Sequence, residues 1–218
     1  SYMDIKKTAN LLINFTIRKL AEVFGIIIFI TGTLLLIALL NYSPEDPNFI
    51  FPDNTKIKNI LGFHGSFISD LFLQSIGLVS YLLSITLLIT GINIFNTKEF
   101  FLIIENIFFT IIYSIFGTLF LSHFYSNAFT LYINGNGGFV GNYLNQTFLS
   151  SLILINNTIF YYILILLIII FFLISINFNP QKFYKKLKQL FIVLNKSKEK
   201  NYTDKSEVIS EYIPQDEI

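Results

Sequence analysis

Four long apolar stretches dominate the hydropathy pattern of the chain, and polar segments separate them. They cover about residues 23–42, 71–95, 100–124 and 158–178. A helix rises about 1.5 Å per residue, so crossing a hydrocarbon core about 30 Å thick takes about 20 apolar residues. Lipid offers no partner to a free backbone N–H or C=O group. Each stretch is therefore predicted to form a transmembrane helix.

A fifth apolar stretch, residues 139–155, is shorter and more polar. Two asparagines, a glutamine and two serines interrupt it, and Asn156 and Asn157 separate it from the last long stretch. We interpret it as a short interfacial or re-entrant helix and not as a fifth crossing. The predicted fold class is an all-α membrane protein with four transmembrane helices and this additional helix before the last span.

The composition agrees with a membrane protein and excludes several kinds of site. Hydrophobic residues make up 53% of the chain and charged residues 13%, against about 25% charged in soluble domains. Cysteine is absent, which excludes disulfides, thiolate metal sites and cysteine nucleophiles. The two histidines, His64 and His123, are too few and too far apart in sequence to indicate a zinc site. We expect no catalytic, cofactor or metal site in this chain.

The distribution of basic residues predicts the orientation, because Lys and Arg accumulate on the cytoplasmic side of a membrane. With four crossings, thirteen basic residues lie inside and two, Lys56 and Lys58, lie outside. A fifth crossing would place the eight lysines of the C-terminal tail outside. Both termini are therefore predicted to be cytoplasmic, with external loops at residues 43–70 and 125–157.

The flanking segments complete the predicted organisation. Residues 1–22 form a cytoplasmic amphipathic segment, residues 23–178 the four-span domain, and residues 196–218 the start of a charged cytoplasmic linker. Between them, residues 179–195 are predicted to form a juxtamembrane amphipathic basic helix. Its apolar residues share one face and its lysines lie largely elsewhere, which suits contact with an anionic leaflet. Contact with DNA is the alternative, but the segment directly follows a span.

The first external loop begins with NYSPEDPNF, residues 41–49. Ser43 has the chemistry of a helix cap, Pro44 fits a first helical position, and Asp46 before Pro47 disfavours continuing the turn. We interpret the stretch as a compact polar knot that ends the first span.

This loop and the segment after it carry the motifs of a known family. The matching positions are Tyr42, Ser43, Pro44, Asp46, Pro47, Phe49, Asn59, Gly62, Gly65, Asp70, Gln74, Gly77 and Tyr81, followed by the glycine-rich GNGGFVG with Gly138 and Gly141. Over residues 18–178 the chain resembles the N-terminal four-span membrane domain, or 4TM domain, of the FtsK/SpoIIIE family of bacterial DNA translocases. The departures are minor, such as Asn48 and Ser66 in place of the family's serine and alanine.

The resemblance implies a role at the division septum in the bacterial cytoplasmic (inner) membrane. Such a domain anchors and oligomerises an ATP-driven motor, a ring of six, that pumps double-stranded DNA and so couples cell division to chromosome segregation. The implied partners are the lipid bilayer, further copies of the chain, other division proteins and, only through the motor, DNA. ATP and Mg²⁺ are expected for the motor alone.

The motor itself is not expected within these residues. Its phosphate loop requires a Gly-Lys pair, and the sequence contains none. We interpret the chain as a fragment or a truncated product, and not as an enzyme. The alternative function is a small multi-span transporter or channel-like subunit. Transport favours ionisable residues at mid-membrane or paired broken helices, and the sequence pattern indicates neither.

Several individual positions carry expectations of their own. Ser66, Asp70, Gln74, Gly77, Tyr81 and Ser84 recur every three or four residues and predict a polar packing face on the second span. The alternatives are contact with other division proteins or an ion pathway.

Gly25 and Gly32 predict close helix packing. Glu105 is interpreted as a boundary acid with Lys98 or a tail lysine as partner. Gly135 to Gly141 lacks the spacing of a nucleotide fingerprint and predicts a sharp turn or tight packing.

Overall fold

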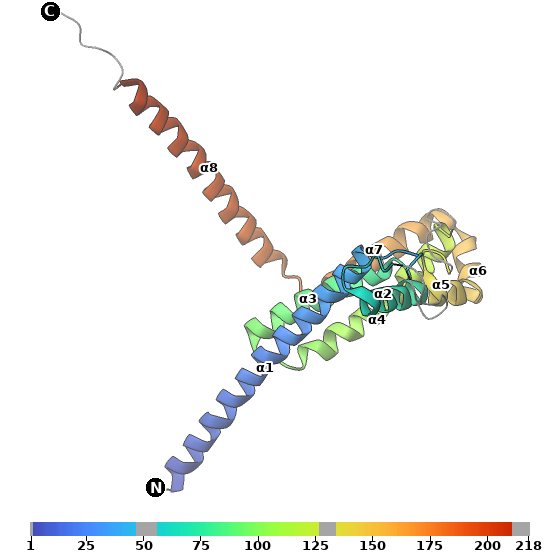
Figure 1. Cartoon of the computed structure of the whole chain (residues 1–218), viewed down its shortest axis with the longest axis horizontal. Coiled ribbons are helices and arrows are strands. Elements are labelled where there is room, and N and C mark those ends of the chain that lie inside the picture. Colours follow the sequence, from blue (N-terminus) through green and yellow to red (C-terminus); the bar gives the residue numbers. More distant parts are fainter. Residues whose placement is uncertain (1, 47–55, 127–133, 211–218) are drawn as a thin grey trace, which may run out of the picture. The chain divides into compact units, whose positions relative to one another are not determined.

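The computed structural model describes residues 2–46, 56–126 and 134–210, and every regular element in these ranges is a helix (Figure 1). The chain divides into two compact units, Ser1–Asn177 and Phe178–Ile218. The helices are α1 (Tyr2–Leu40), α2 (Gly62–Ile76), α3 (Val79–Thr97), α4 (Leu102–Phe124), α5 (Gly138–Asn145), α6 (Phe148–Ile155), α7 (Asn157–Ser175) and α8 (Pro180–Ser210).

Four of these helices are long and apolar enough to cross a membrane. They are the Asp4–Leu40 part of α1, together with α3, α4 and α7. The prediction of an all-α protein with four spans is therefore confirmed. α2 has 15 residues, and α5 and α6 have eight each, so α5 and α6 are each only about 12 Å long.

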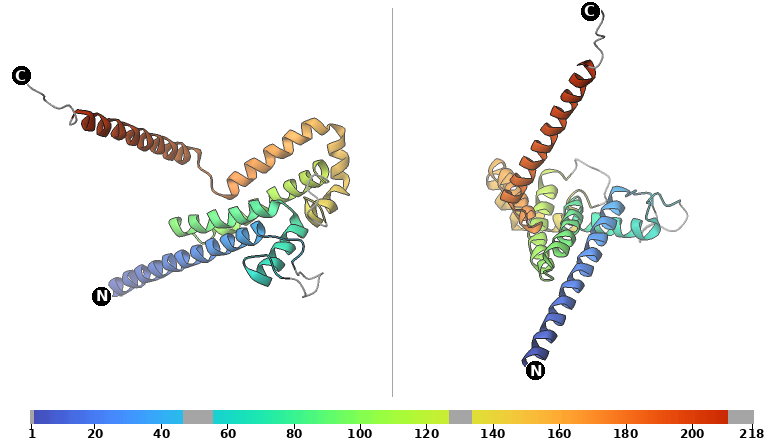
Figure 2. Two further views of the ribbon diagram at one scale, coloured as in Figure 1. Left: turned by 45° about the horizontal axis from the view of Figure 1, so that its top comes forward. Right: turned by 90° about the vertical axis from the view of Figure 1, so that its left-hand side faces the viewer.

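α1 and α3 pack side by side and antiparallel through glycines (Figure 2). A Cβ atom on Gly25 would lie 2.8 Å from the Gly91 carbonyl oxygen, and one on Gly91 would lie 2.4 Å from the Phe29 nitrogen. At Gly32 the obstacle would be the Leu88 nitrogen, at 2.5 Å. Such close backbone contact strengthens the van der Waals attraction between helices in lipid. The predicted packing role of Gly25 and Gly32 is confirmed, and Gly91 is a third member that the sequence pattern did not single out.

α4 and α7 pack antiparallel through aromatic rings. Phe171 stacks with Phe109 and Phe116 at centroid distances of 6.2 and 6.0 Å, and Phe120 lies 5.2 Å from Tyr161. α3 and α4 are also antiparallel, because Val79 faces Gly117 near one end of the pair and Thr90 binds Asn106 near the other. The four spans α1, α3, α4 and α7 therefore alternate in direction.

The predicted second span, residues 71–95, is not one continuous helix. Gly77 has φ 60° and ends α2, and the helix long enough to cross begins at Val79. The N–H of Leu78 donates to the Asn136 carbonyl oxygen at 2.9 Å. A hydropathy average over the stretch does not register one glycine with a positive φ, which is why the pattern predicts a longer span. The external segment 43–70 correspondingly contains most of α2.

The ambiguous segment 139–155 forms two short helices instead of the single one predicted. α5 ends at Asn145, and Thr147 caps α6 by accepting a hydrogen bond from the Leu149 N–H. Asn156 then caps α7 through the Ile159 N–H at 3.2 Å. Successive caps divide the chain into pieces too short to span, which explains why no fifth crossing arises here.

In the second unit, α8 begins at a complete N-terminal capping motif. Asn179 accepts hydrogen bonds from the N–H groups of Gln181 and Lys182 at 3.0 and 3.2 Å, and Pro180 occupies the first helical position. Phe178 packs on Phe183 across this cap at a centroid distance of 5.4 Å, as in a hydrophobic staple. α8 continues to Ser210, beyond the predicted end at residue 195, because no proline or glycine interrupts residues 181–210.

Candidate functional site

The polar knot after α1 is organised by one buried carboxylate. Asp46 is 1% exposed, and its two oxygens accept hydrogen bonds from the backbone N–H groups of Lys58 (2.6 Å) and Asn59 (2.9 Å). Its own N–H donates to the Ser43 carbonyl oxygen at 3.1 Å. Ser43 to Asp46 is therefore a tight turn and not a helix start. The carboxylate ties the end of the first span to the chain entering α2.

Asn59 connects this knot to the helix below it. Its side-chain amide donates to the Ala38 carbonyl oxygen at 2.9 Å, and its side-chain oxygen accepts the Leu61 N–H at 3.1 Å. Gly65 lies directly against it, since a Cβ there would approach the Asn59 Oδ1 to 2.5 Å. Asn59 satisfies a carbonyl in the last turn of α1, where intrahelical partners run out.

A second polar group joins α1, α2 and the chain before α5. The Tyr42 hydroxyl donates to Asp70 Oδ1 at 3.1 Å, and Gln74 Nε2 lies 3.5 Å from the same oxygen. The Gln74 Oε1 atom accepts the Asn134 N–H at 3.2 Å. Tyr81, on α3, donates to the Leu39 carbonyl oxygen at 3.0 Å. Asp70 and Tyr81 thus both bind the end of the first span, and Gln74 binds the chain before α5.

The glycine-rich segment packs where α2 turns into α3. A Cβ on Gly77 would lie 1.8 Å from the Asn136 carbonyl oxygen, and one on Gly138, which has φ 65°, would lie 2.6 Å from Ser75 backbone atoms. On the other side of α5, Gly141 faces Ser122 of α4, where a Cβ would meet the hydroxyl at 2.2 Å. The segment therefore makes both a turn and a tight contact, the two alternatives that its glycines predict.

The opposite end of the first unit contains a polar ladder that the sequence pattern did not reveal. Asn106 of α4 is 1% exposed, donates to Thr90 Oγ1 at 2.8 Å, and exchanges two hydrogen bonds with Asn177, of 2.7 and 3.0 Å. Asn93 of α3 donates to Asn177 Oδ1 at 3.1 Å. These contacts bind three spans together at the point where α7 ends.

The ladder extends one layer further into the spans. Thr86 of α3 lies 2.9 Å from the Tyr113 hydroxyl of α4 and 3.0 Å from the Ser175 hydroxyl of α7, and all three residues are buried. Single asparagines and threonines in apolar stretches look isolated in sequence. A spacing of three or four residues, as from Thr86 to Thr90 and Asn93, was the available signal.

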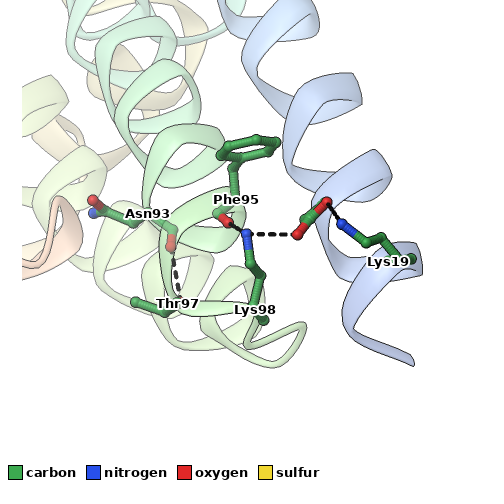
Figure 3. Close-up of polar contacts among 6 residues, drawn as sticks. Lys19, Asn93, Phe95, Thr97 and Lys98 are labelled. Atoms are coloured by element: carbon green, nitrogen blue, oxygen red, sulfur yellow. Dashed lines mark hydrogen bonds and ion pairs between the residues drawn. The ribbon is translucent and has the colours of Figure 1, made fainter. Parts of the chain in front are cut away.

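An ion-pair group lies at the same end of the unit, between α1 and α3 (Figure 3). Glu22 pairs with Lys19 at 2.9 Å and with Lys98 at 2.8 Å. The Lys98 ammonium also lies 4.5 Å from the Phe95 ring centroid. Of the two partners expected for Glu105, Lys98 therefore pairs with Glu22 instead, and a tail lysine stays a prediction. Lys98 has φ 62°, which turns its side chain from the end of α3 toward α1.

The predicted site residues do not converge on one site. Asp46, Gly65, Asp70, Gly77, Gly138 and Gly141 are buried, Ser43, Gln74 and Tyr81 are partly buried, and Pro44 is exposed. Gly62 has φ 71° and open space around it. Pro47 and Phe49 lie outside the described residues. Ser66 and Ser84 of the predicted stripe are buried as well, although the break at Gly77 divides that stripe between α2 and α3.

The chemistry of these groups suits structural contact. In the parts of the chain that the structure describes, no three His, Asp or Glu residues approach closely enough to hold a metal ion. His123 interacts with Asn145 of α5 at 2.9 Å, and His64 is exposed on α2. Lys58 pairs with Glu45, and this hydrogen bond lowers the pKa of the Glu45 carboxyl and raises the pKa of Lys58.

These features define a multi-span helical membrane protein whose polar side chains bind its helices to one another. Comparison with known families matches residues 17–188 to the 4TM region of DNA translocase FtsK/SpoIIIE. The match covers most of the chain, so the chain belongs to this family, and the predicted resemblance to it is confirmed.

Individual relatives are distant and much longer. A DNA translocase FtsK of Azospirillum brasilense is 29% identical over 79 residues, which is 35% of this chain and 12% of the relative. That of Caulobacter vibrioides is 34% identical over 68 residues (31% and 8%), and that of Rickettsia prowazekii is 31% identical over 72 (33% and 10%). The aligned segments thus span about a tenth of each relative. No solved structure matches the chain.

Proposed function

We propose that this chain is the membrane-anchoring and oligomerisation region of a septal DNA translocase of the FtsK type, and that it couples cell division to chromosome segregation. The observation that carries the proposal is the family match over residues 17–188, which is a match to the membrane region and not to a motor. ATP and Mg²⁺ would be bound by the motor of such a translocase, which also contacts the double-stranded DNA.

The contacts at the end of α7 support an anchoring role. A motor that follows this region would pull on the chain where it leaves the last span, at Ser175 to Asn177. Asn177 hydrogen-bonds to Asn93 and Asn106, and Ser175 to Thr86, so a pull there reaches α3 and α4. The glycine contacts between α3 and α1 then carry it to the first span.

The alternating directions of the four spans support a common side for both ends of the region. Thirteen of the fifteen basic residues then lie on that side, which we assign to the cytoplasm. The cellular location that follows is the bacterial inner membrane at the septum. The expected partners are other division proteins and further copies of this chain, in a ring of six that matches the family's motor.

The proposal is tested by localisation and by counting subunits. A fluorescent fusion of residues 1–218 is expected to concentrate at the septum of dividing cells, and native mass spectrometry from lipid nanodiscs is expected to show oligomers, up to six copies. Uniform membrane fluorescence together with a strictly monomeric chain would contradict the proposal.

The alternative function, a small transporter or channel-like subunit, is tested on the same material. The ionisable groups of the described spans argue against it. Lys98 and Glu105 lie at helix ends, Glu22 of α1 lies just before the apolar stretch 23–42, and α7 contains no charged residue. Proteoliposomes loaded with a pH-sensitive dye and with radiolabelled ions are expected to show the flux of empty liposomes. Flux that rises with the amount of protein would favour the alternative.

A further inference from the structure

The helix that follows the last span, α8, carries a continuous apolar face in solvent. Every described side chain from Pro180 to Lys196 is exposed. At 100° per residue, one arc of about 120° contains six apolar or aromatic side chains. They are Phe183, Tyr184, Leu187, Leu190, Phe191 and Leu194, and their exposed fractions run from 48% to 69%. An apolar face of this size on a solvent-exposed surface indicates a binding site for a partner or a membrane.

The rest of the helix circumference carries the lysines, together with Ile192 and Val193. Lys182, Lys185 and Lys196 lie opposite the apolar face, while Lys186 and Lys188 flank its two edges. No Asp or Glu occurs from Gln181 to Lys198. The partner must therefore offer an apolar layer and, directly beside it, negative charge. The headgroup and acyl boundary of an anionic lipid leaflet has this arrangement.

The start of α8 is encoded locally and lies close to the membrane. The Asn179 cap and the contact of Phe178 with Phe183 fix the first turn without help from another helix. Four residues separate Ser175, the end of α7, from Pro180. Chain reach then limits the start of α8 to about 18 Å from the end of that span.

We propose that the Phe183–Leu194 part of α8 binds the surface of an anionic lipid leaflet, with its apolar face inserted among the headgroups and its lysines against the lipid phosphates. Two other occupants fit less well. Duplex DNA would contact the lysines but leave the phenylalanines and leucines in water. A second copy of α8 would cover those residues but would bring two sets of lysines together. The proposal requires a membrane-spanning chain and does not rest on the translocase function.

The absence of cysteine from the chain allows a direct test. Phe191→Cys on the apolar face and Gln189→Cys on the opposite face each receive one nitroxide label in the full chain, reconstituted in lipid nanodiscs. In discs of phosphatidylcholine with phosphatidylglycerol, the label at 191 is expected to be accessible to oxygen and protected from a water-soluble nickel complex. The label at 189 is expected to show the reverse. Both labels are expected to be accessible to nickel in pure phosphatidylcholine.

A charge variant tests the role of the lysines. Replacing Lys182, Lys185, Lys186 and Lys188 with glutamine keeps the helix propensity and removes four charges. At about fivefold per lysine, the equilibrium constant for binding the surface is expected to fall several hundredfold, so that the label at 191 becomes accessible to nickel in anionic discs. Raising the salt concentration is expected to act in the same direction.

Four results would overturn the proposal. The first is equal nickel accessibility at 189 and 191 in anionic discs, and the second is protection that persists unchanged in phosphatidylcholine or in the charge variant. Protection that disappears on dilution to one chain per disc would assign the face to self-association. Protection that requires added duplex DNA would assign it to DNA.

Discussion

At the residue scale, single backbone positions decide where one helix ends and the next begins. Gly77 is the main example. It combines a φ of 60° with direct contact against the Asn136 carbonyl oxygen, so both its conformation and its lack of a side chain are required. Gly62 has a similar φ of 71°, but nothing lies within 4 Å of a Cβ placed there. A substitution at Gly62 therefore meets only the strain of a positive φ, whereas one at Gly77 also meets a steric clash.

We predict that Gly77→Ala lowers stability much more than Gly62→Ala. A positive φ costs a non-glycine residue about 1–3 kcal/mol, and this cost applies to both variants. Gly77→Ala must also move α5 away from the start of α3, for a total loss of about 3 kcal/mol or more. Thermal unfolding of each variant in detergent, followed by circular dichroism, measures the difference. Equal losses would show that the contact with Asn136 is not close in solution.

Also at this scale, we predict a pH dependence at the exposed pair of Glu45 and Lys58. The hydrogen bond from Lys58 lowers the Glu45 pKa, so the stabilisation is complete above its ordinary value of 4.5 and is lost as the pH falls through the lowered value. The Lys58 pKa is raised, so the same stabilisation is complete below 10.5 and is lost at higher pH, as the pH rises through the raised value. The effect is small because both side chains are exposed.

The measurement is the melting temperature of the native chain minus that of Glu45→Gln, taken from pH 3 to pH 7. The difference is expected to be constant above about pH 5 and to shrink as the pH falls further. Lys58→Met is the matched control, and its own difference is expected to shrink over the same range. A difference that grows toward acid pH would contradict the ion pair.

At the element scale, the polar ladder joins α3, α4 and α7 at one end of the spans. Hydrogen bonds between helices in lipid contribute on average about 0.6 kcal/mol each. Asn106 makes three of them, one with Thr90 and two with Asn177. These bonds form in only one alignment of the three helices.

We predict that Asn106→Ala lowers the free energy of unfolding by about 1–3 kcal/mol, since the buried Thr90 loses its hydrogen bond from Asn106 and Asn177 loses two. Asn177→Ala is expected to cost a similar amount. The double variant is expected to cost less than the sum of the two, because both remove the same pair. Unfolding by titration with a denaturing detergent measures each value.

Asn96→Ala is the control for this cycle. Asn96 lies on the exposed side of α3, one turn from the ladder, and its replacement is expected to change stability by less than about 0.5 kcal/mol. Fully additive losses for Asn106 and Asn177 would show that the two side chains do not interact.

At the scale of the whole molecule, the alternating directions of the spans and the lysine distribution predict that both ends lie on one side of the membrane. We predict that a green fluorescent protein fused after Ile218 is fluorescent in cells and that alkaline phosphatase at the same position is inactive. Phosphatase inserted after Ser126, between α4 and α5, is expected to be active. The reverse pattern would contradict both the orientation and an anchoring role for a cytoplasmic motor.

Some of this architecture follows from the sequence alone because it depends on local properties. The number of spans depends on the length of apolar runs, and the start of α8 depends on the Asn179–Pro180 signal and the Phe178 staple. The family resemblance could also be recognised from the sequence, since it depends on the order and spacing of motif residues such as Asp46, Asn59 and Gly65. The pattern of Phe183, Leu187, Leu190 and Leu194 similarly predicts the apolar face of α8.

Other features exist only in the folded molecule, because they join groups that are far apart in the chain. Asp46 in sequence is a loop acid, and only folding surrounds it with the N–H groups of Lys58 and Asn59. Lys98 pairs with Glu22 of α1 and not with Glu105, which is nearer in sequence, because its αL backbone directs the side chain toward α1. In the sequence, Gly77 belongs to an apolar run, and only the folded structure shows that Asn136 packs against it. Hydropathy thus determined which segments enter the lipid, and hydrogen bonds and backbone contacts between distant segments decided how they are joined.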